Sequence, residues 1–522
     1  MNTDSGPKSV HISRVYYRLG AAYAQQENPD KALQYYQRAL VAIKNDFTDS
    51  LDIFSNPTLD GRLYDDTHLL ETLHEKARML ALVPDKSGRH LEYSLSTYQL
   101  AIRWTDSLRQ TYVLEGNELL WSESFKNIYS EAIHTAYQLY EKRQSPEYLK
   151  TAFSLSEKSK SLLLLEAFTT KTGRRNTSVP QVLLDQERDL SVDIAYYEKT
   201  YDRVLEERDS SRAALFQSYL RDARLELAHL KEQIESDYPD YYQLKYEGQT
   251  FDPDSIQVVL PDQQSALIEY FIGKEHAYAF VSSQENLQMI PLPHPDSIKS
   301  HLSAFRALLF DTKSFLSSPK QAYQQFNDAA YRLYDELLGT AIDQLPAAID
   351  NLVIIPDEGL NTVPFEVFNT KLVTQASSNF GALPYLIRDY QIQYTYSIKL
   401  LQKNQERLLD IQPNNQCLAF APSYREASRS IEELDVRGNR LRSGISVLEN
   451  TAAEIEGIEQ YFDGIFIASS DATKAKFVEL AAQYGILHLA MHGEADYENT
   501  NFGHLIFSNA DTNTLEHNLL YH

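Results

Sequence analysis

The sequence is poor in cysteine and has no long apolar run. Its single cysteine, Cys417, excludes an internal disulfide framework. Together with the lack of a charged and then apolar leader at the N-terminus, this favours a cytoplasmic location. The longest leucine cluster, Ser161–Glu166, is far too short to cross a membrane. We therefore expect a soluble protein with no membrane partner.

Positive charge is also scarce. Lys and Arg number 49 against 73 Asp and Glu, which gives a formal net charge of -24. A nucleic-acid binder needs a surplus of Lys and Arg to neutralise phosphates, so direct binding of nucleic acid is not expected. At 522 residues, of which 43% are hydrophobic, the chain can build roughly two to four domains, each with its own core.

The N-terminal part has the spacing of paired helices. Small and aromatic residues recur at helical intervals on both sides of a turn at Asn28–Asp30. They are Tyr16, Leu19, Gly20, Tyr23, Ala32, Tyr36 and Ala39. This pattern resembles the tetratricopeptide repeat, although Lys44 stands where the consensus has its closing proline. Weaker pairs follow up to about residue 168 and predict a solenoid, with a plain helical bundle as the alternative.

Two further segments separate these repeats from the rest. Residues 169–180 have no apolar period and are predicted to form a linker. Within 181–248, apolar residues at helical spacing predict two long helices that meet near 208–212. A helical hairpin is the expected result.

From residue 249 the period changes to that of strands. Two apolar runs at 266–271 and 277–281 predict a β-hairpin, and 287–290 a third strand. After two helices, strands alternate with helices from Asn351 onward. The strand candidates are 352–355, 391–394, 418–420, 465–468 and 486–490. Continuous apolar strands between helices predict a mainly parallel sheet covered on both faces, with functional groups at the carboxyl ends of the strands.

One histidine is predicted to lie at such a strand end. The run that ends in Met491 is followed directly by His492 and Gly493. A general base beside a backbone N–H that can approach a carbonyl oxygen is the pairing that acyl transfer needs. A purely structural histidine is the alternative interpretation of these two residues by themselves.

Four segments together resemble the CHAT family, the caspase-like peptidases that occur with tetratricopeptide repeats and are grouped with caspases and separases. The segments are Leu352–Glu366, Tyr394–Ser397, Thr451–Glu454 and Leu487–Glu494. The resemblance implies that His492 is the catalytic histidine, that the N–H of Gly493 contributes to the oxyanion hole and that a cysteine on the next core strand is the nucleophile. It also implies a bacterial source and a role in immunity or programmed cell death.

The sequence contains no cysteine after His492. Cys417 precedes the histidine, and its neighbours Leu418, Ala419 and Phe420 indicate a buried core residue. We therefore expect the chain to end before the nucleophile and to be inactive as given.

Other polar residues near this site have simpler interpretations. His488 lies four residues before His492, but a third metal ligand with suitable spacing is missing, and His504 is the only nearby candidate. We expect His488 to be buried and hydrogen-bonded. The loop acids Asp357, Glu358, Glu494 and Asp496 could orient His492 or select a basic substrate residue, but are expected to be only solvated.

Taken together, the sequence predicts a helical solenoid and hairpin followed by a caspase-like α/β domain with a mainly parallel sheet. The predicted limits are 1–168 for the repeats, 169–180 for the linker, 181–248 for the hairpin and 249–522 for the CHAT domain. We expect a cysteine endopeptidase that cleaves a protein substrate without cofactor or metal, and whose repeats bind a protein partner or regulator. The alternative is a non-catalytic scaffold for protein–protein interaction.

Overall fold

The fold was analysed in a computed structural model of the chain. It describes residues 8–44, 46–58, 66–112, 118–160, 179–206, 210–238, 260, 262–284, 286–375, 377–410, 414–424, 448, 450–494, 504–508 and 519–521. The chain divides into two compact units, residues 1–403 and residues 404–522. Each unit is described by itself.

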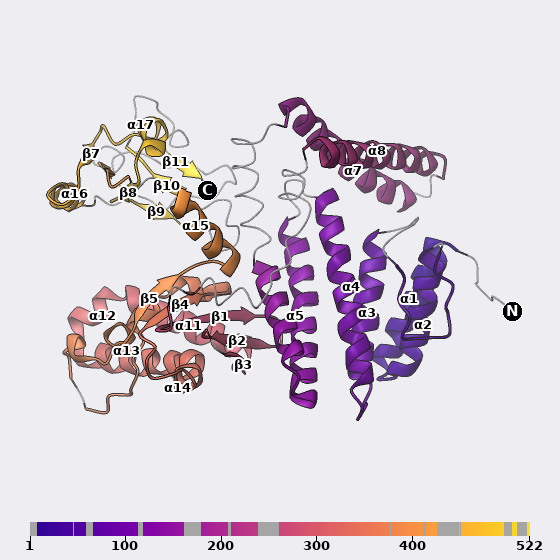
Figure 1. Ribbon diagram of the computed structural model, residues 1–522, viewed down its shortest axis with the longest axis horizontal. Coiled ribbons are helices and arrows are strands. Elements are labelled where there is room, and N and C mark those ends of the chain that lie inside the picture. The colour runs from indigo at the N-terminus through magenta and orange to yellow at the C-terminus, as the bar shows by residue number, and fades with distance from the viewer. Residues whose placement is uncertain are drawn as a thin grey trace. The chain divides into compact units, whose positions relative to one another are not determined.

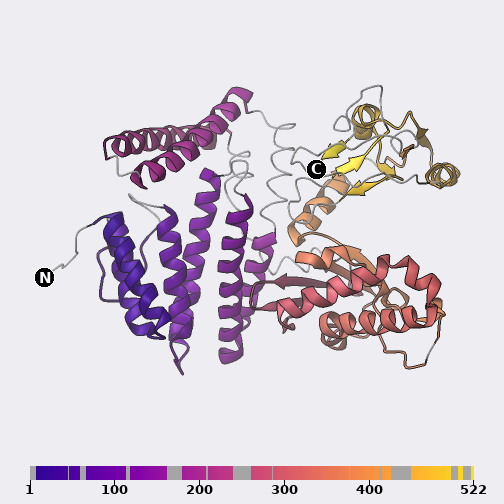
Figure 2. The same cartoon turned by 180° about the vertical axis from the view of Figure 1, so that it is seen from behind.

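The first unit begins with a row of helices that pack side by side (Figures 1 and 2). They are α1 (Val10–Gln25), α2 (Pro29–Ile43), α3 (Asp66–Leu82), α4 (Arg89–Tyr112), α5 (Glu118–Arg143) and a helical segment at 146–160. The predicted turn between α1 and α2 is confirmed, because the Asn28 side chain accepts a hydrogen bond from the N–H of Lys31 and Pro29 opens α2. Gly20 allows the close approach of the two helices, since a Cβ there would lie 2.8 Å from Cε1 of Tyr36.

The predicted helical hairpin is formed by α7 (Gln181–Glu206) and α8 (Ser210–Asp237). One apolar stripe from each helix makes their shared core, with Ile194 and Ile234 fully buried. Helix α8 begins at Ser210, within the segment 208–212 that was predicted to be the turn. Most of the predicted linker, residues 169–178, lies outside the described residues.

A five-stranded sheet follows in the order β3-β2-β1-β4-β5. Its strands are β1 (Ser265–Ile272), β2 (Ala277–Ser282), β3 (Leu287–Pro291), β4 (Asn351–Ile355) and β5 (Gln391–Tyr394). The hairpin strands β1, β2 and β3 pair antiparallel, whereas β4 pairs parallel with both β1 and β5. The predicted hairpin and strand positions are therefore confirmed, in a mixed sheet.

Helices cover both faces of this sheet. Alternate residues of β1 point to opposite faces: Leu267 and Phe271 pack against α5 and the segment 146–160, while Ile268 and Tyr270 pack on the other side. The other side is covered by α11 (Pro295–Phe310) and α13 (Pro319–Tyr334). Short helical elements complete this region: α12 (Thr312–Ser317), a π-helical turn at Asp335–Gly339 and α14 (Thr340–Asp343). The repeat region and the sheet thus share one hydrophobic core.

Helix α15 (Ile398–Asp410) begins in the first unit and ends in the second. Its first backbone N–H, that of Ile398, donates to both carboxylate oxygens of Glu157 at 3.0 and 3.1 Å. Glu157 is buried, and this burial together with the neighbouring Glu269 carboxyl raises its pKa well above the usual range. A side chain of the repeat region therefore caps the start of α15.

The second unit contains a parallel sheet in the order β7-β6-β8. Its strands are β6 (Cys417–Pro422), β7 (Gly464–Ser469) and β8 (Ile486–Leu489). Residues of α16 (Thr451–Glu459) pack on one face and residues of α17 (Lys474–Leu480) on the other. Thr473 caps α17, with its hydroxyl accepting from the N–H of Lys476.

A small antiparallel sheet completes the second unit. It is formed by β9 (Gly493–Glu494), β10 (His504–Ile506) and β11 (Leu519–Tyr521). The chain is thus a helical repeat region followed by an α/β region, as the sequence predicted. None of the described helices has the length and apolar composition that a membrane crossing requires.

Candidate functional site

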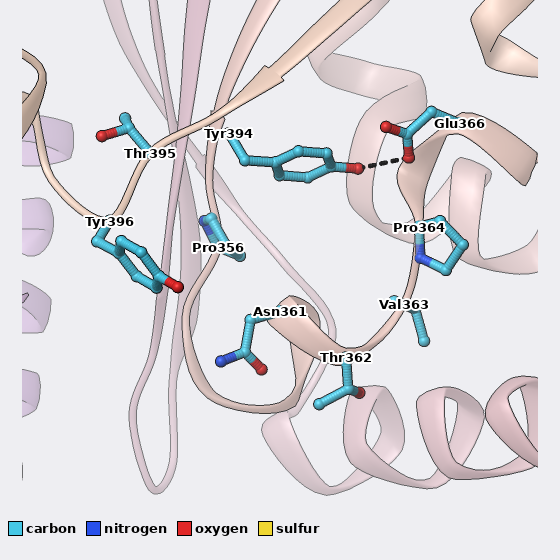
Figure 3. Close-up of a pocket in the computed structure, with 9 residues that line it drawn as sticks. All are labelled: Pro356, Asn361, Thr362, Val363, Pro364, Glu366, Tyr394, Thr395 and Tyr396. Atoms are coloured by element: carbon cyan, nitrogen blue, oxygen red, sulfur yellow. Dashed lines mark hydrogen bonds between the residues drawn. The ribbon is translucent and has the colours of Figure 1, made fainter. Parts of the chain in front are cut away.

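The carboxyl ends of β4 and β5 form the wall of a hollow in the first unit (Figure 3). After β4 the chain turns at Pro356 and passes through a 3₁₀ turn, Glu358–Thr362, and after β5 it continues through Thr395. The hollow has a volume of about 650 Å³. Its lining residues are Pro356, Asn361, Thr362, Val363, Pro364, Glu366, Tyr394, Thr395 and Tyr396. Functional groups were expected at this edge of the sheet.

Tyr394 and Glu366 hold the two walls of the hollow together. The Tyr394 hydroxyl donates to Oε2 of Glu366 at 2.7 Å and accepts from the N–H of Phe365 at 2.9 Å. Burial of the hydroxyl and its hydrogen bond to the carboxylate both raise the pKa of Tyr394. Tyr394 as a whole residue is nevertheless 45% exposed, and Tyr396 is 58% exposed. The hollow therefore presents two accessible aromatic rings beside one carboxylate.

The expectation that Asp357 is only solvated is wrong. Its side chain is only 14% exposed, accepts from the N–H of Ile272 at 2.7 Å and pairs with Nζ of Lys126 at 3.2 Å. Although burial opposes ionisation, the charges of Lys126 and Lys160 and these hydrogen bonds hold the pKa of Asp357 below its usual range. Asp357 thus anchors α5 to the sheet, and the neighbouring Glu358 contacts the same lysine.

In the second unit, His492 lies just beyond the carboxyl end of β8 and is half-buried. The N–H of His492 donates to the Tyr424 hydroxyl at 3.1 Å, and this hydroxyl donates to the carbonyl of Ile506 at 2.7 Å. The carbonyl of His492 accepts from the N–H of Ile506 at 3.0 Å. The rings of Tyr424 and His492 also touch, with centroids 4.9 Å apart. Tyr424, which is 2% exposed, therefore fixes the backbone of His492.

Gly493 begins β9 and lies opposite Leu505. In an antiparallel pair, hydrogen-bonded and non-hydrogen-bonded residue pairs alternate. Because Ile506 is bonded to His492, Gly493 and Leu505 form the non-bonded pair, so the N–H of Gly493 points away from β10. A Cβ at this position would lie 3.3 Å from Cδ2 of Leu505, so a larger residue would crowd the strand.

Cys417 lies in the β7-β6-β8 sheet, at the end opposite to His492. It is fully buried at the start of β6, which confirms the predicted core position, and burial raises the pKa of its thiol. It pairs with Ile486, six residues before His492. At about 3.3 Å per residue, the thiol is roughly 20 Å from the histidine along the strand direction.

The remaining predicted residues lie apart from His492. The Nε2 of His488 contacts Oε1 of Glu454 on α16 at 2.9 Å, so the expected hydrogen bond is present, but its side chain is 32% exposed and is not buried as predicted. Strand β8 lies at the edge of its sheet, which leaves His488 partly exposed. Among the described residues no three His, Cys, Asp or Glu side chains are placed to hold a metal ion. Glu494 pairs with His504 through the backbone, and Asp496 lies outside the described residues.

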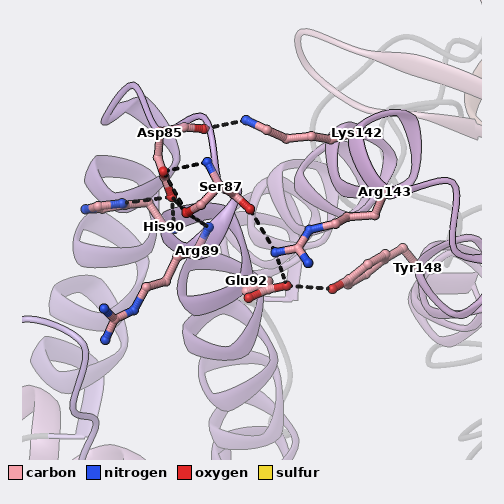
Figure 4. A network of polar contacts seen from close by, with 8 residues as sticks. All are labelled: Asp85, Ser87, Arg89, His90, Glu92, Lys142, Arg143 and Tyr148. Atoms are coloured by element: carbon pink, nitrogen blue, oxygen red, sulfur yellow. Dashed lines mark hydrogen bonds and ion pairs between the residues drawn. The ribbon is translucent and has the colours of Figure 1, made fainter.

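A second hollow, of about 490 Å³, lies in the helical region between the α3–α4 turn and α5. A polar network holds the turn against the end of α5 (Figure 4). The Asp85 carboxylate accepts from the N–H of Ser87 at 2.8 Å, and the carbonyl of Ser87 accepts from Arg143 at 2.8 Å. Arg143 also pairs with Glu92, and Lys142 contacts the carbonyl of Asp85. This rigid rim makes the hollow a candidate surface for a protein partner.

The sequence analysis missed Tyr424. It follows β6 in the run Pro422-Ser423-Tyr424, and parallel strands place their carboxyl ends at one edge. Ser423 and Ser508 meet at this edge through a 3.0 Å hydrogen bond. The position of Tyr424 directly after the central strand could therefore have indicated that it lies near His492.

Comparison with known families identifies both parts of the chain. Residues 13–43 match the tetratricopeptide repeat and residues 327–521 match the CHAT domain. No curated protein matched the chain. CHAT domains are related to caspase-like peptidases, and tetratricopeptide repeats suggest protein interaction. The matches therefore identify a tetratricopeptide repeat in the helical region and a CHAT domain in the α/β region.

Proposed function

We propose that this chain serves a caspase-like cysteine endopeptidase activity, with His492 as the general base and the N–H of Gly493 as an oxyanion donor. The supporting observation is the backbone geometry at the end of β8. Tyr424 and Ile506 hold His492 in place, while the N–H of Gly493 is directed away from β10. A base and a donor on adjacent residues satisfy two requirements of acyl transfer.

In the proposed reaction, the imidazole of His492 takes the proton of a cysteine thiol. The thiolate attacks the peptide carbonyl, and the negative charge that develops on the carbonyl oxygen is stabilised by the N–H of Gly493. His492 then donates its proton to the leaving amine as the C–N bond breaks. Water, deprotonated by His492, hydrolyses the acyl-enzyme and regenerates the thiol.

Cys417 does not suit the nucleophile in this scheme, because it is fully buried at the opposite end of the sheet. By the family resemblance, the nucleophile lies on the core strand that follows His492, and residues 493–522 contain no cysteine. The proposal therefore needs a nucleophilic cysteine that residues 1–522 do not supply.

We further propose that the CHAT domain begins near residue 249, upstream of the matched residues. The parallel pairing of β1 with β4 supports this limit, because it places residues 265–272 in the same sheet as the matched segment. In the same proposal, residues 1–168 bind a protein partner or regulator and 181–248 form a separate hairpin. A cytoplasmic location is also proposed, on cysteine content alone.

The test uses the full-length natural protein. A thiol-reactive peptide chloromethyl ketone should label a cysteine other than Cys417 in it. His492→Ala should abolish labelling. The matched control, His488→Ala, removes a histidine four residues away that contacts Glu454, and it should leave labelling largely intact. Absence of such a cysteine, or full labelling of the His492→Ala variant, would rule out the peptidase.

The second candidate is a non-catalytic scaffold, which the inaccessibility of Cys417 favours. A scaffold would bind its partner with unchanged affinity after His492→Ala and would not process it. A peptidase would lose substrate cleavage in the same variant.

A further inference from the structure

The outer edge of β5 is open among the described residues. β5 is the last strand of the sheet, and Gln391, Gln393 and Tyr394 are exposed. The N–H groups of Gln391 and Thr395 donate to the carbonyls of Asp350 and Ile354, at 2.7 and 3.1 Å. In a parallel pair, every second residue of a strand bonds to the same neighbour. The N–H and C=O groups of Ile392 and Tyr394 therefore point away from β4. An exposed row of unpaired N–H and C=O groups is a template for another strand.

The hollow at the end of β4 and β5 lies directly along this edge, because Tyr394 belongs to both. Figure 3 shows the Tyr394 ring pointing to Glu366 and the Tyr396 ring lying near Pro356. The Tyr394 hydroxyl donates a hydrogen bond to Oε2 of Glu366 only. Among the described residues, no other partner of this carboxylate is found. A side chain entering the hollow would therefore meet two aromatic rings and one carboxylate oxygen.

We propose that β5 binds an extended segment of a partner protein by strand addition, and that a Lys or Arg of this segment enters the hollow between Tyr394, Tyr396 and Glu366. Backbone hydrogen bonds to Ile392 and Tyr394 supply the general affinity, and the hollow supplies the side-chain preference. This inference goes beyond the proposed peptidase, because binding needs no nucleophile.

Charge determines which residue the hollow prefers. Glu366 is the only charged residue in the lining, and the whole chain carries a formal net charge of -24. A cation also gains from the faces of the two tyrosine rings. Near Thr362 the hollow already has a positive charge, because Arg306 Nη1 contacts the Thr362 hydroxyl at 3.4 Å. A second cation is therefore expected to bind beside Glu366. An acidic segment would meet like charge on Glu366.

The test starts from a phage-displayed library of random dodecapeptides selected on the purified full chain. Selected peptides are synthesised with a fluorophore, and their affinities are measured by fluorescence anisotropy. We expect enrichment of one Lys or Arg within a β-prone sequence, and replacing this residue by Ala should weaken binding about tenfold, the value of one charge-assisted hydrogen bond.

Three variants separate the two parts of the site. Glu366→Gln should weaken the basic peptide about tenfold, yet change its Ala version less than twofold. Ile392→Pro removes an outward N–H and should abolish binding, with the melting temperature showing that the sheet persists. The matched control, Asp389→Asn, removes an exposed carboxylate outside the lining and should leave the affinity unchanged.

Three results would overturn the proposal. One is a library that yields no binder, or binders without a basic residue. The second is unchanged affinity of the basic peptide for Glu366→Gln. The third is unchanged affinity for a folded Ile392→Pro protein, which would exclude strand addition.

Discussion

Lys160 lies in a buried cluster of charges between the helical segment 146–160 and strand β1. Its Nζ is 2.9 Å from Oε1 of Glu269, and the two side chains are 7% and 0% exposed. Ser156 donates to the same carboxylate oxygen, and Glu157 lies beside Glu269 with a raised pKa. Lys160→Met would leave a buried carboxylate without its cation.

The size of the effect follows from the buried carboxylate that loses its partner. Breaking a buried ion pair by removing one partner typically costs about 3–5 kcal/mol, because it leaves an uncompensated buried charge. We expect Lys160→Met to lower the free energy of unfolding by about 3–5 kcal/mol. Urea unfolding at pH 7, followed by the fluorescence of Trp104 and Trp121, which lie on α4 and α5, measures this loss.

The matched control is the double variant Lys160→Met with Glu269→Gln, in which neither charge remains. Its stability should return to within about 1.5 kcal/mol of the original protein, since buried ion pairs are often replaced by neutral groups at little cost. A double variant no more stable than Lys160→Met would show that the buried, unpaired carboxylate is not the cause of the loss.

Three further predictions concern other contacts. Tyr424→Phe removes the hydroxyl between His492 and Ile506 and should destabilise the second unit by about 1–3 kcal/mol, with faster amide hydrogen exchange in β10 as the measurement. In Gly464→Ala the new Cβ would lie 1.8 Å from the carbonyl oxygen of Cys417, so β7 must shift, and urea unfolding should show a loss of at least about 2 kcal/mol. Burial, and then the charge of the stacked His276, lower the pKa of His134 to about 4, so stability should fall as the pH drops from about 6.5 towards 4, and His134→Phe should reduce this loss in thermal melts at each pH.

The sequence predicted the elements better than the contacts between them. The turn before α2 followed from Asn28 and Pro29, and all five strands predicted after Asn351 are present. These features depend on neighbouring residues, so their pattern is visible in the chain itself. The tetratricopeptide packing of Gly20 on Tyr36 was accessible for the same reason.

Contacts between distant residues could not be predicted in this way. Ser156 and Glu269 are 113 positions apart, and nothing in the local pattern distinguishes Glu269 from a solvated acid within a strand. Asp357 was misjudged because its partner Lys126 is 231 positions away. The orientation of the Gly493 N–H depends on the register with β10, which apolar periodicity does not specify.

The helical region and the five-stranded sheet share one core. This restricts which repeats can be joined to the sheet by recombination in evolution. Glu269 is neutralised by a lysine of the repeat region, and the first N–H of α15 is bound by Glu157 of the same helical segment. A recombination event that joined foreign repeats to this sheet would leave one acid buried without a cation and one helix start without a cap. The helical segment 146–160 and the sheet are therefore expected to be inherited as one piece, while the outer repeats can be gained, lost or exchanged.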